Sequence, residues 1–266
     1  FVLVGYAFSG FSIYHPSAFQ FGSIDAAQPD LRASLSGVTG IVTNGLLTAY
    51  AGTEDYGLLS VNMRDNGVHQ VLGREVGSVD CMAYVGGGLW LGLDGRGVAR
   101  LDAAGGLLRF DSPDAPLALR GSVPARMTAG ASGGLWVACA DNLAYLPTPG
   151  AVNPTEGAVE RKFPEPIVGV RPSGAGVLVL LRSRLCKASV SGGRMLVENL
   201  VTGGLASLRP VDMWQGADSV IWVAAAHCVV AYAAKGPGGG LAEVGRVEME
   251  NPLAMSSDEA GNVVVA

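Results

Sequence analysis

Three charged residues recur at one spacing in a chain that carries few charges. Asp80, Arg126 and Asp212 each stand ten residues before a tryptophan. Opposite charges at one structural level suit two roles: they coordinate a ligand, or they pair with each other because a charge removed from water needs a partner. Structural ion pairing is the commoner role, and we expect Asp80 and Arg126 to approach each other.

The sign of the charge reverses between residues 161 and 209. Eight cations in this segment face two carboxylates, Glu165 and Glu198, whereas the whole chain has a formal net charge of -5. Arg182, Arg184 and Lys187 fall in or just after one turn, so we expect them to project from a single rim. Clustered cations suit an acidic or phosphorylated partner, although a solvated, solubilising turn explains them as well.

Charged residues also fill the equivalent turns elsewhere in the chain. Asp94 and Arg96 share one such turn, and we add them to the candidate partner-binding residues. Further carboxylates in neighbouring turns could ring a hard cation such as calcium. Aspartate also favours turns because its side chain bonds to nearby backbone amides, and we prefer this explanation and predict no metal site.

The sequence has little that is typical of catalysis. Its histidines, His15, His69 and His227, are scattered, and no His-Glu-x-x-His pair is present. Glycine-rich turns are numerous, but no helix is expected after them to complete a phosphate cradle. We therefore predict that the protein is not an enzyme and uses no cofactor.

A repeat positions these residues. The stretch from Gly88 to Ala104 predicts two short strands joined by a polar turn, and its anchor, Trp90, has counterparts at intervals of 40 to 47 residues. A period in the low forties is typical of a β-propeller, in which each repeat forms one four-stranded antiparallel blade. The anchor positions are Leu3, Tyr50, Trp90, Trp136, Leu178, Trp222 and Val264.

The repeat runs from one end of the chain to the other. It predicts a single all-β propeller domain over residues 1–266, and we expect the chain to be an excerpt of a longer one. The first copy lacks its inner strand and the last stops at its anchor strand. Seven blades are preferred and six are possible, in which case Leu253 to Ser257 would complete the first blade.

Composition further limits the kinds of partner and location that the protein can have. Hydrophobic residues make up 49% of the chain and charged residues 15%, and no apolar run is long enough to span a membrane as a helix. The negative net charge argues against a nucleic-acid partner. Four cysteines without close spacing suggest free thiols and a reducing compartment, so we predict a cytoplasmic location.

The phrases Gly-Leu-Trp-Leu-Gly-Leu-Asp-Gly-Arg-Gly-Val-Ala-Arg-Leu-Asp at 88–102 and Gly-Gly-Leu-Trp-Val-Ala at 133–138 resemble the blade repeat of the WD-repeat-like propeller superfamily. Two branches are similar: the sensor propellers of bacterial two-component regulators and the C-terminal propellers of eukaryotic signalling scaffolds. Both resemblances imply binding rather than catalysis, and the first implies a periplasmic location.

Together these observations predict a non-catalytic scaffold or adaptor. Its partner would be a protein or peptide, acidic or phosphorylated, held by Arg182, Arg184, Lys187, Arg96 and Asp94, while Asp80, Arg126 and Asp212 would line the central tunnel. A ligand-sensing propeller of a signalling receptor is the alternative. A propeller hydrolase or lyase is the second alternative, and it would need histidines and carboxylates that converge on one point.

Overall fold

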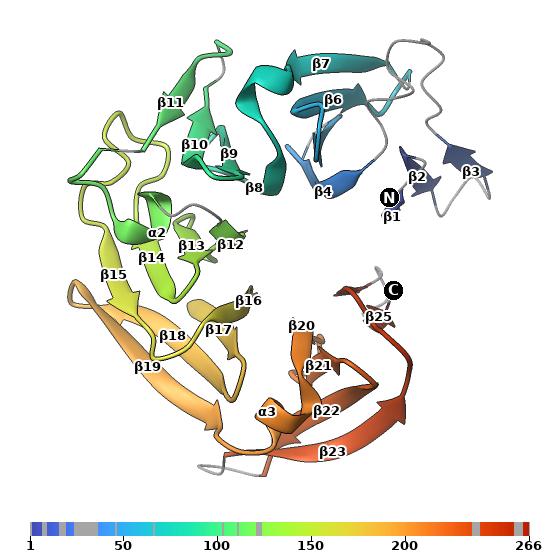
Figure 1. Cartoon of the computed structure of the whole chain (residues 1–266), viewed down its shortest axis with the longest axis vertical. Helices are drawn as coiled ribbons and strands as arrows, with labels where there is room; N and C mark the ends of the chain where they lie inside the picture. The colour runs from blue at the N-terminus through green and yellow to red at the C-terminus, as the bar shows by residue number, and fades with distance from the viewer. Residues whose placement is uncertain are drawn as a thin grey trace.

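A computed structural model describes most of the chain. It covers residues 37–45, 47–65, 67–102, 104–110, 112–120, 124–235, 240–257 and 263–265, and the strand backbones at 2–6, 10–15 and 20–23. Five complete four-stranded antiparallel sheets follow one another along the sequence and stand side by side around a centre (Figure 1). These sheets are the predicted blades.

Each complete blade runs from an inner to an outer strand in chain order. The sheets are β4 (Val38–Thr43), β5 (Thr48–Thr53), β6 (Leu58–Asn62), β7 (Val68–Leu72); β8 (Val79–Val85), β9 (Gly88–Leu93), β10 (Gly97–Leu101), β11 (Leu107–Arg109); β12 (Pro124–Ala129), β13 (Leu135–Cys139), β14 (Asn142–Leu146), β15 (Val159–Lys162); β16 (Ile167–Ser173), β17 (Gly176–Leu181), β18 (Leu185–Ser191), β19 (Arg194–Val201); and β20 (Pro210–Gln215), β21 (Ile221–Ala225), β22 (Cys228–Ala234), β23 (Leu241–Glu248). We number them blades two to six.

Two smaller sheets flank the complete blades. One contains β1 (Val2–Tyr6), β2 (Gly10–His15) and β3 (Gln20–Ser23), and the other contains β24 (Met255–Ser257) and β25 (Val263–Val265). β24 lies beside the inner strand β20 and pairs with β25, so in the described part of the chain it starts a seventh sheet instead of completing the first. This pairing supports the seven-blade prediction.

The antiparallel blades give the ring two distinct ends. Turns between the second and third strands, such as 94–96 and 182–184, lie at one end, which we call the turn face. Hairpins between the first and second strands, such as those at Gly86 and Gly174, lie at the opposite end, which we call the hairpin face. A side chain near one end of a blade therefore lies close to the face at that end.

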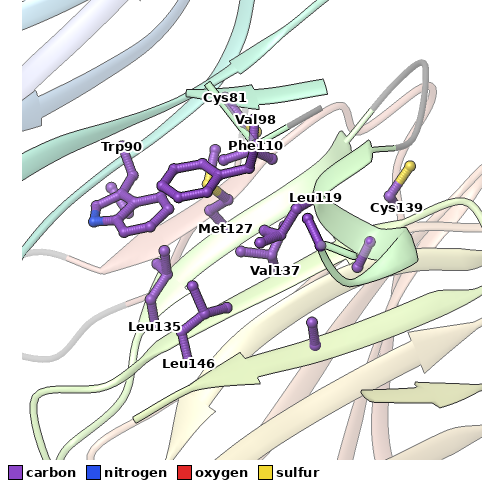
Figure 2. Packing of buried hydrophobic residues seen from close by; sticks show 14 of the residues in the cluster. Cys81, Trp90, Val98, Phe110, Leu119, Met127, Leu135, Val137, Cys139 and Leu146 are labelled. Atoms are coloured by element: carbon purple, nitrogen blue, oxygen red, sulfur yellow. The ribbon is translucent and has the colours of Figure 1, made fainter. Parts of the chain in front are cut away.

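The anchor residues pack each blade against the next. Trp90 of β9 is fully buried and stacks on Phe110, with 5.0 Å between ring centroids and 14° between ring planes. Figure 2 shows this pair above Leu135 and Leu146, which belong to the following blade. Alternate residues of β9, including Leu91, pack in the other direction. Because both faces of the strand are covered, all six of its residues are buried.

The small residue two places after each anchor has a packing role. A Cβ atom at Gly52 would lie 2.9 Å from the carbonyl oxygen of Val79, on the inner strand of the next blade. Blade five departs from this pattern with Leu180, and its anchor is the smaller Leu178. Both leucines are buried in the cluster shared with blade six. The smaller anchor therefore compensates for the larger residue two places later.

All four cysteines are free and buried. Cys81 lies on β8 and Cys139 at the end of β13 (Figure 2). Burial raises the pKa of the Cys81 thiol to about 12, with opposing contributions from the nearby Arg126 and Asp80. Burial likewise raises the pKa of Cys186. The Cys81 and Cys186 thiols are therefore protonated at neutral pH.

The helical segments of the described chain are short. They are η2 (Arg74–Val76), α2 (Leu117–Arg120) and α3 (Leu205–Leu208), each in a connection between blades. Among the described residues, no helix has the length and apolar character needed to cross a membrane.

Candidate functional site

Asp212 is the centre of a polar network on the inner strands. Its side chain is only 4% exposed, and both carboxylate oxygens accept from Nη2 of Arg171 at 2.9 Å. The Met213 backbone N–H donates to Oδ1 and the Met255 backbone N–H donates to Oδ2, each at 2.9 Å. The carboxylate therefore joins three consecutive inner strands, β16, β20 and β24.

Arg171 completes this connection. Its Nε donates to the carbonyl oxygen of Met213 at 3.0 Å, and its guanidinium carbon lies 5.6 Å from the centre of the Trp214 ring. The cation is thus held by a carboxylate, a carbonyl and an aromatic face, all from β20. A carboxylate that accepts four hydrogen bonds from three donor groups has little capacity left for a ligand, so this network serves inter-blade stability.

The other two predicted tunnel residues lie at different registers. Arg126 is opposite Ala138 and Asp212 is opposite Ala224, but Asp80 lies in a β-bulge between Val79 and Cys81. The expectation of one common level is therefore wrong for Asp80. Trp90 lies opposite Ala83, one residue closer in sequence than Trp136 to Thr128 or Trp222 to Trp214, so counting back ten residues from Trp90 overshoots by one.

The predicted tunnel residues make polar contacts with neighbouring parts of the chain, and these contacts have a structural role. Asp80 accepts a 2.6 Å hydrogen bond from the Ser78 hydroxyl. Asp80 and Arg126 both lie close enough to the Cys81 thiol to affect its pKa, and their direct pairing stays a prediction. Asp212 is on an inner strand as expected, but it is enclosed between strands rather than exposed to a channel. Its cationic partner is Arg171, which the sequence argument had not selected.

A second network organises the turn of blade five. Glu165, in the connection before β16, accepts from the Ser183 backbone N–H at 2.9 Å, from the Ser183 hydroxyl at 2.6 Å and from Arg184 Nε at 3.0 Å. Its carboxylate thus fixes the 182–184 turn against the preceding connection. Arg182 is exposed and makes no ion pair or hydrogen bond with any residue that the structure describes.

Lys187 does not belong to this rim. It lies on β18 opposite Leu178, and its Nζ is 4.0 Å from the position that a Cβ on Gly174 would occupy. Gly174 is in the hairpin at the other end of the blade. The ammonium group is therefore directed to the hairpin face, and the prediction of a single rim holds for Arg182 and Arg184 but is wrong for Lys187.

Asp94 and Arg96 occupy the corresponding turn of blade three. Both are exposed on the turn face. Nη1 of Arg96 donates to the carbonyl oxygen of Glu75, in the connection before β8, so this arginine also holds a turn to its neighbouring connection. The Asp94 backbone N–H donates to the carbonyl oxygen of Ser78 at 3.1 Å.

A serine motif in the chain was missed by the sequence argument. Gly130 to Gly134 matches Gly-x-Ser-x-Gly, the pattern of a hydrolase nucleophile. The segment forms the β12–β13 hairpin instead of a strand-to-helix turn, and the Ser132 and Tyr145 hydroxyls lie 3.0 Å apart. The pattern therefore arises from a glycine-rich turn. Within the described residues, no group of three or more histidine, cysteine or carboxylate side chains could hold a metal ion.

Solved structures of other proteins share the fold of this chain. An extracellular domain assigned to a hybrid two-component system of Bacteroides thetaiotaomicron is 13% identical, with a TM-score of 0.73 over 99% of this chain and 35% of that one. The WD40 propeller domain of Doa1 is 9% identical, with a TM-score of 0.59 over 85% of this chain and 73% of that one. The chain is a β-propeller.

The propeller fold is shared by proteins of different activities. Virginiamycin B lyase from Staphylococcus aureus is 14% identical, with a TM-score of 0.63 over 86% of this chain and 77% of that one. This propeller spans about a third of the two-component domain. No protein-family model and no curated protein sequence matches it. Similarity at these identities establishes the fold, and function has to be argued from the side chains.

Proposed function

We propose that this propeller is a non-catalytic interaction domain whose turn face binds a protein or peptide partner. The candidate contact is the 182–184 turn of blade five, and the partner segment is acidic or phosphorylated. The observation that carries the proposal is the combination of a turn fixed by Glu165 with an exposed, unpaired Arg182 at its start.

Pre-organisation supports this choice of site. The Glu165 carboxylate holds the backbone and side chain of Ser183, so little conformational entropy is lost there when a partner binds. Arg184 donates to Glu165 through Nε, so its two Nη groups can still donate to a partner. Its side chain is 37% exposed. Two forked cations on a fixed turn suit carboxylate or phosphate groups.

The polar residues of the inner strands support a binding role over a catalytic one. Asp212 and Arg171 saturate each other and the backbone around them. The alternative of a propeller lyase or hydrolase needs an acid or base with spare hydrogen-bonding capacity beside a substrate. Asp212 has little such capacity, and we therefore retain the scaffold or adaptor function.

Charge reversal at Arg182 tests the proposal. Arg182→Glu is expected to weaken binding of a phosphoserine-containing, glutamate-rich peptide by about tenfold, because an attractive rim charge becomes repulsive. Fluorescence anisotropy of the labelled peptide measures the dissociation constant. The reference is an unphosphorylated peptide in which each glutamate is replaced by glutamine. Arg184→Glu is a poorer choice, since it would place a second carboxylate against Glu165.

Arg194→Glu is the matched control. Arg194 is exposed and begins β19 at the opposite end of the same blade, and its reversal changes the net charge by the same amount. Peptide binding is expected to be unchanged in this variant. Equal weakening by both reversals would show a non-specific charge effect, and unchanged binding in Arg182→Glu would reject the site.

A further inference from the structure

The hairpin face carries a depression that the turn-face site does not use. It has a volume of about 610 Å³ and lies where the inner strands of blades four, five and six end. This volume is typical of sites for small molecules. Its polar side chains come from Ser173, Lys187, Gln215 and Ser219, and the remaining lining is alanine, glycine and proline.

Ser173 places a hydroxyl group at the wall of the depression. Its residue is 7% exposed, and the hydroxyl makes no hydrogen bond to any part of the chain that the structure describes. Because Ser173 lines the depression, a group that enters from solution can supply this hydrogen bond.

Lys187 gives the depression its charge. The ammonium group reaches the Gly174 hairpin, and it forms no ion pair with its cross-strand neighbour Glu198 or with any other described carboxylate. The lining contains no aspartate or glutamate. In the adjacent hairpin, Asp218 uses Oδ1 to accept from the Val220 backbone N–H at 3.1 Å. Among the described residues that line the depression, Lys187 therefore supplies the one formal charge, and it is positive.

The remaining groups suit a ligand with several polar atoms. The Gln215 carboxamide is half-buried and makes no hydrogen bond within the described chain, so it offers both a donor and an acceptor. Gly174 and Gly216 leave the hairpin backbone accessible at the wall. One cation, two hydroxyls and one amide thus line a depression whose other residues are small.

We propose that this depression binds a small organic anion that also carries hydroxyl groups. The Lys187 ammonium takes the anionic group, and the Ser173 hydroxyl and the Gln215 carboxamide bond to its other polar atoms. This site is separate from the proposed peptide site, because Lys187 and Arg182 are directed to opposite faces of blade five. It would allow one domain to bind a small molecule and a partner together.

Gluconate and glucitol make a matched pair of probes. They share a six-carbon polyol skeleton and differ in the carboxylate. Gluconate, titrated at constant ionic strength, is expected to shift the backbone amide resonances of Gly174, Gln215 and Gly216, whereas glucitol leaves them in place. Glucose 6-phosphate, titrated in parallel, shows whether a phosphate ester serves as well as a carboxylate, and binding of either anion supports the proposal.

Variants assign the interaction to the proposed groups. Lys187→Met keeps the apolar stem and is expected to weaken binding of the anion at least tenfold, and Ser173→Ala by several-fold. Lys235→Met is the control, because Lys235 is exposed and does not line the depression. Arg182→Glu should leave anion binding unchanged, so the two proposed sites can fail independently. Equal binding of glucitol, equal binding by Lys187→Met, or no resonance shift with either anion would overturn the proposal.

Discussion

Replacing Asp212 with alanine is expected to lower the free energy of unfolding by about 3–5 kcal/mol. The substitution removes a buried carboxylate and leaves the Arg171 guanidinium, whose side chain is 24% exposed, without its ion pair. It also leaves the Met255 backbone N–H without its acceptor, which loosens the attachment of β24. Chemical denaturation followed by circular dichroism measures the loss.

Two further variants test whether the burial of the Arg171–Asp212 ion pair, rather than its short distance, determines the loss of stability. Arg171→Met in the Asp212→Ala background is expected to recover part of the loss, because it removes the unpaired cation. The Arg246–Glu243 pair has the same 2.9 Å separation but lies on the surface, with side chains about 40% exposed. Glu243→Ala should therefore cost far less than Asp212→Ala. A loss of similar size in both variants would contradict the structural role assigned to Asp212.

Replacing Trp90 with alanine is expected to cost about 3–5 kcal/mol of stability. The indole is fully buried, it stacks on Phe110, and it packs against Leu135 and Leu146 of the next blade. Trp90→Phe should cost less, because it keeps an aromatic ring beside Phe110 and removes an indole N–H that has no partner among the described residues. Denaturation midpoints compare the two variants.

Trp222 provides the matched control for this packing argument. It occupies the same repeat position in blade six but is half-buried, and it borders a cavity of about 450 Å³ next to β25. Trp222→Ala should therefore destabilise the protein less than Trp90→Ala. Equal losses would show that burial against the following blade is not what makes the anchor important.

The sequence predicts the repeating architecture well because the repeat encodes packing. An anchor at an interval near forty residues, a small residue two places later and a glycine hairpin each satisfy a local requirement that the structure confirms. Gly86 shows this directly: its φ is 61°, and an added Cβ would lie 2.5 Å from the backbone nitrogen of Gly150. Such requirements recur in most of the described blades and are visible without coordinates.

The polar networks were less predictable because they join residues that do not occupy equivalent positions of the repeat. Glu165 and Arg184 are on different elements, and the Arg171–Asp212 pair joins two blades. Hairpin length also shifts the register, which moves Asp80 into a bulge and away from the level of Arg126 and Asp212. For Lys187, position near a turn did not determine which face its side chain reaches.

The binding role rests on the 182–184 turn, and hydrogen–deuterium exchange tests it most directly. Adding the phosphoserine-containing, glutamate-rich peptide should slow amide exchange in the 182–185 segment of the wild-type protein, and Arg182→Glu should abolish this protection. The β12–β13 hairpin on the opposite face should be unaffected. Protection that falls on the hairpin face, or that persists in Arg182→Glu, would contradict the proposed interaction site.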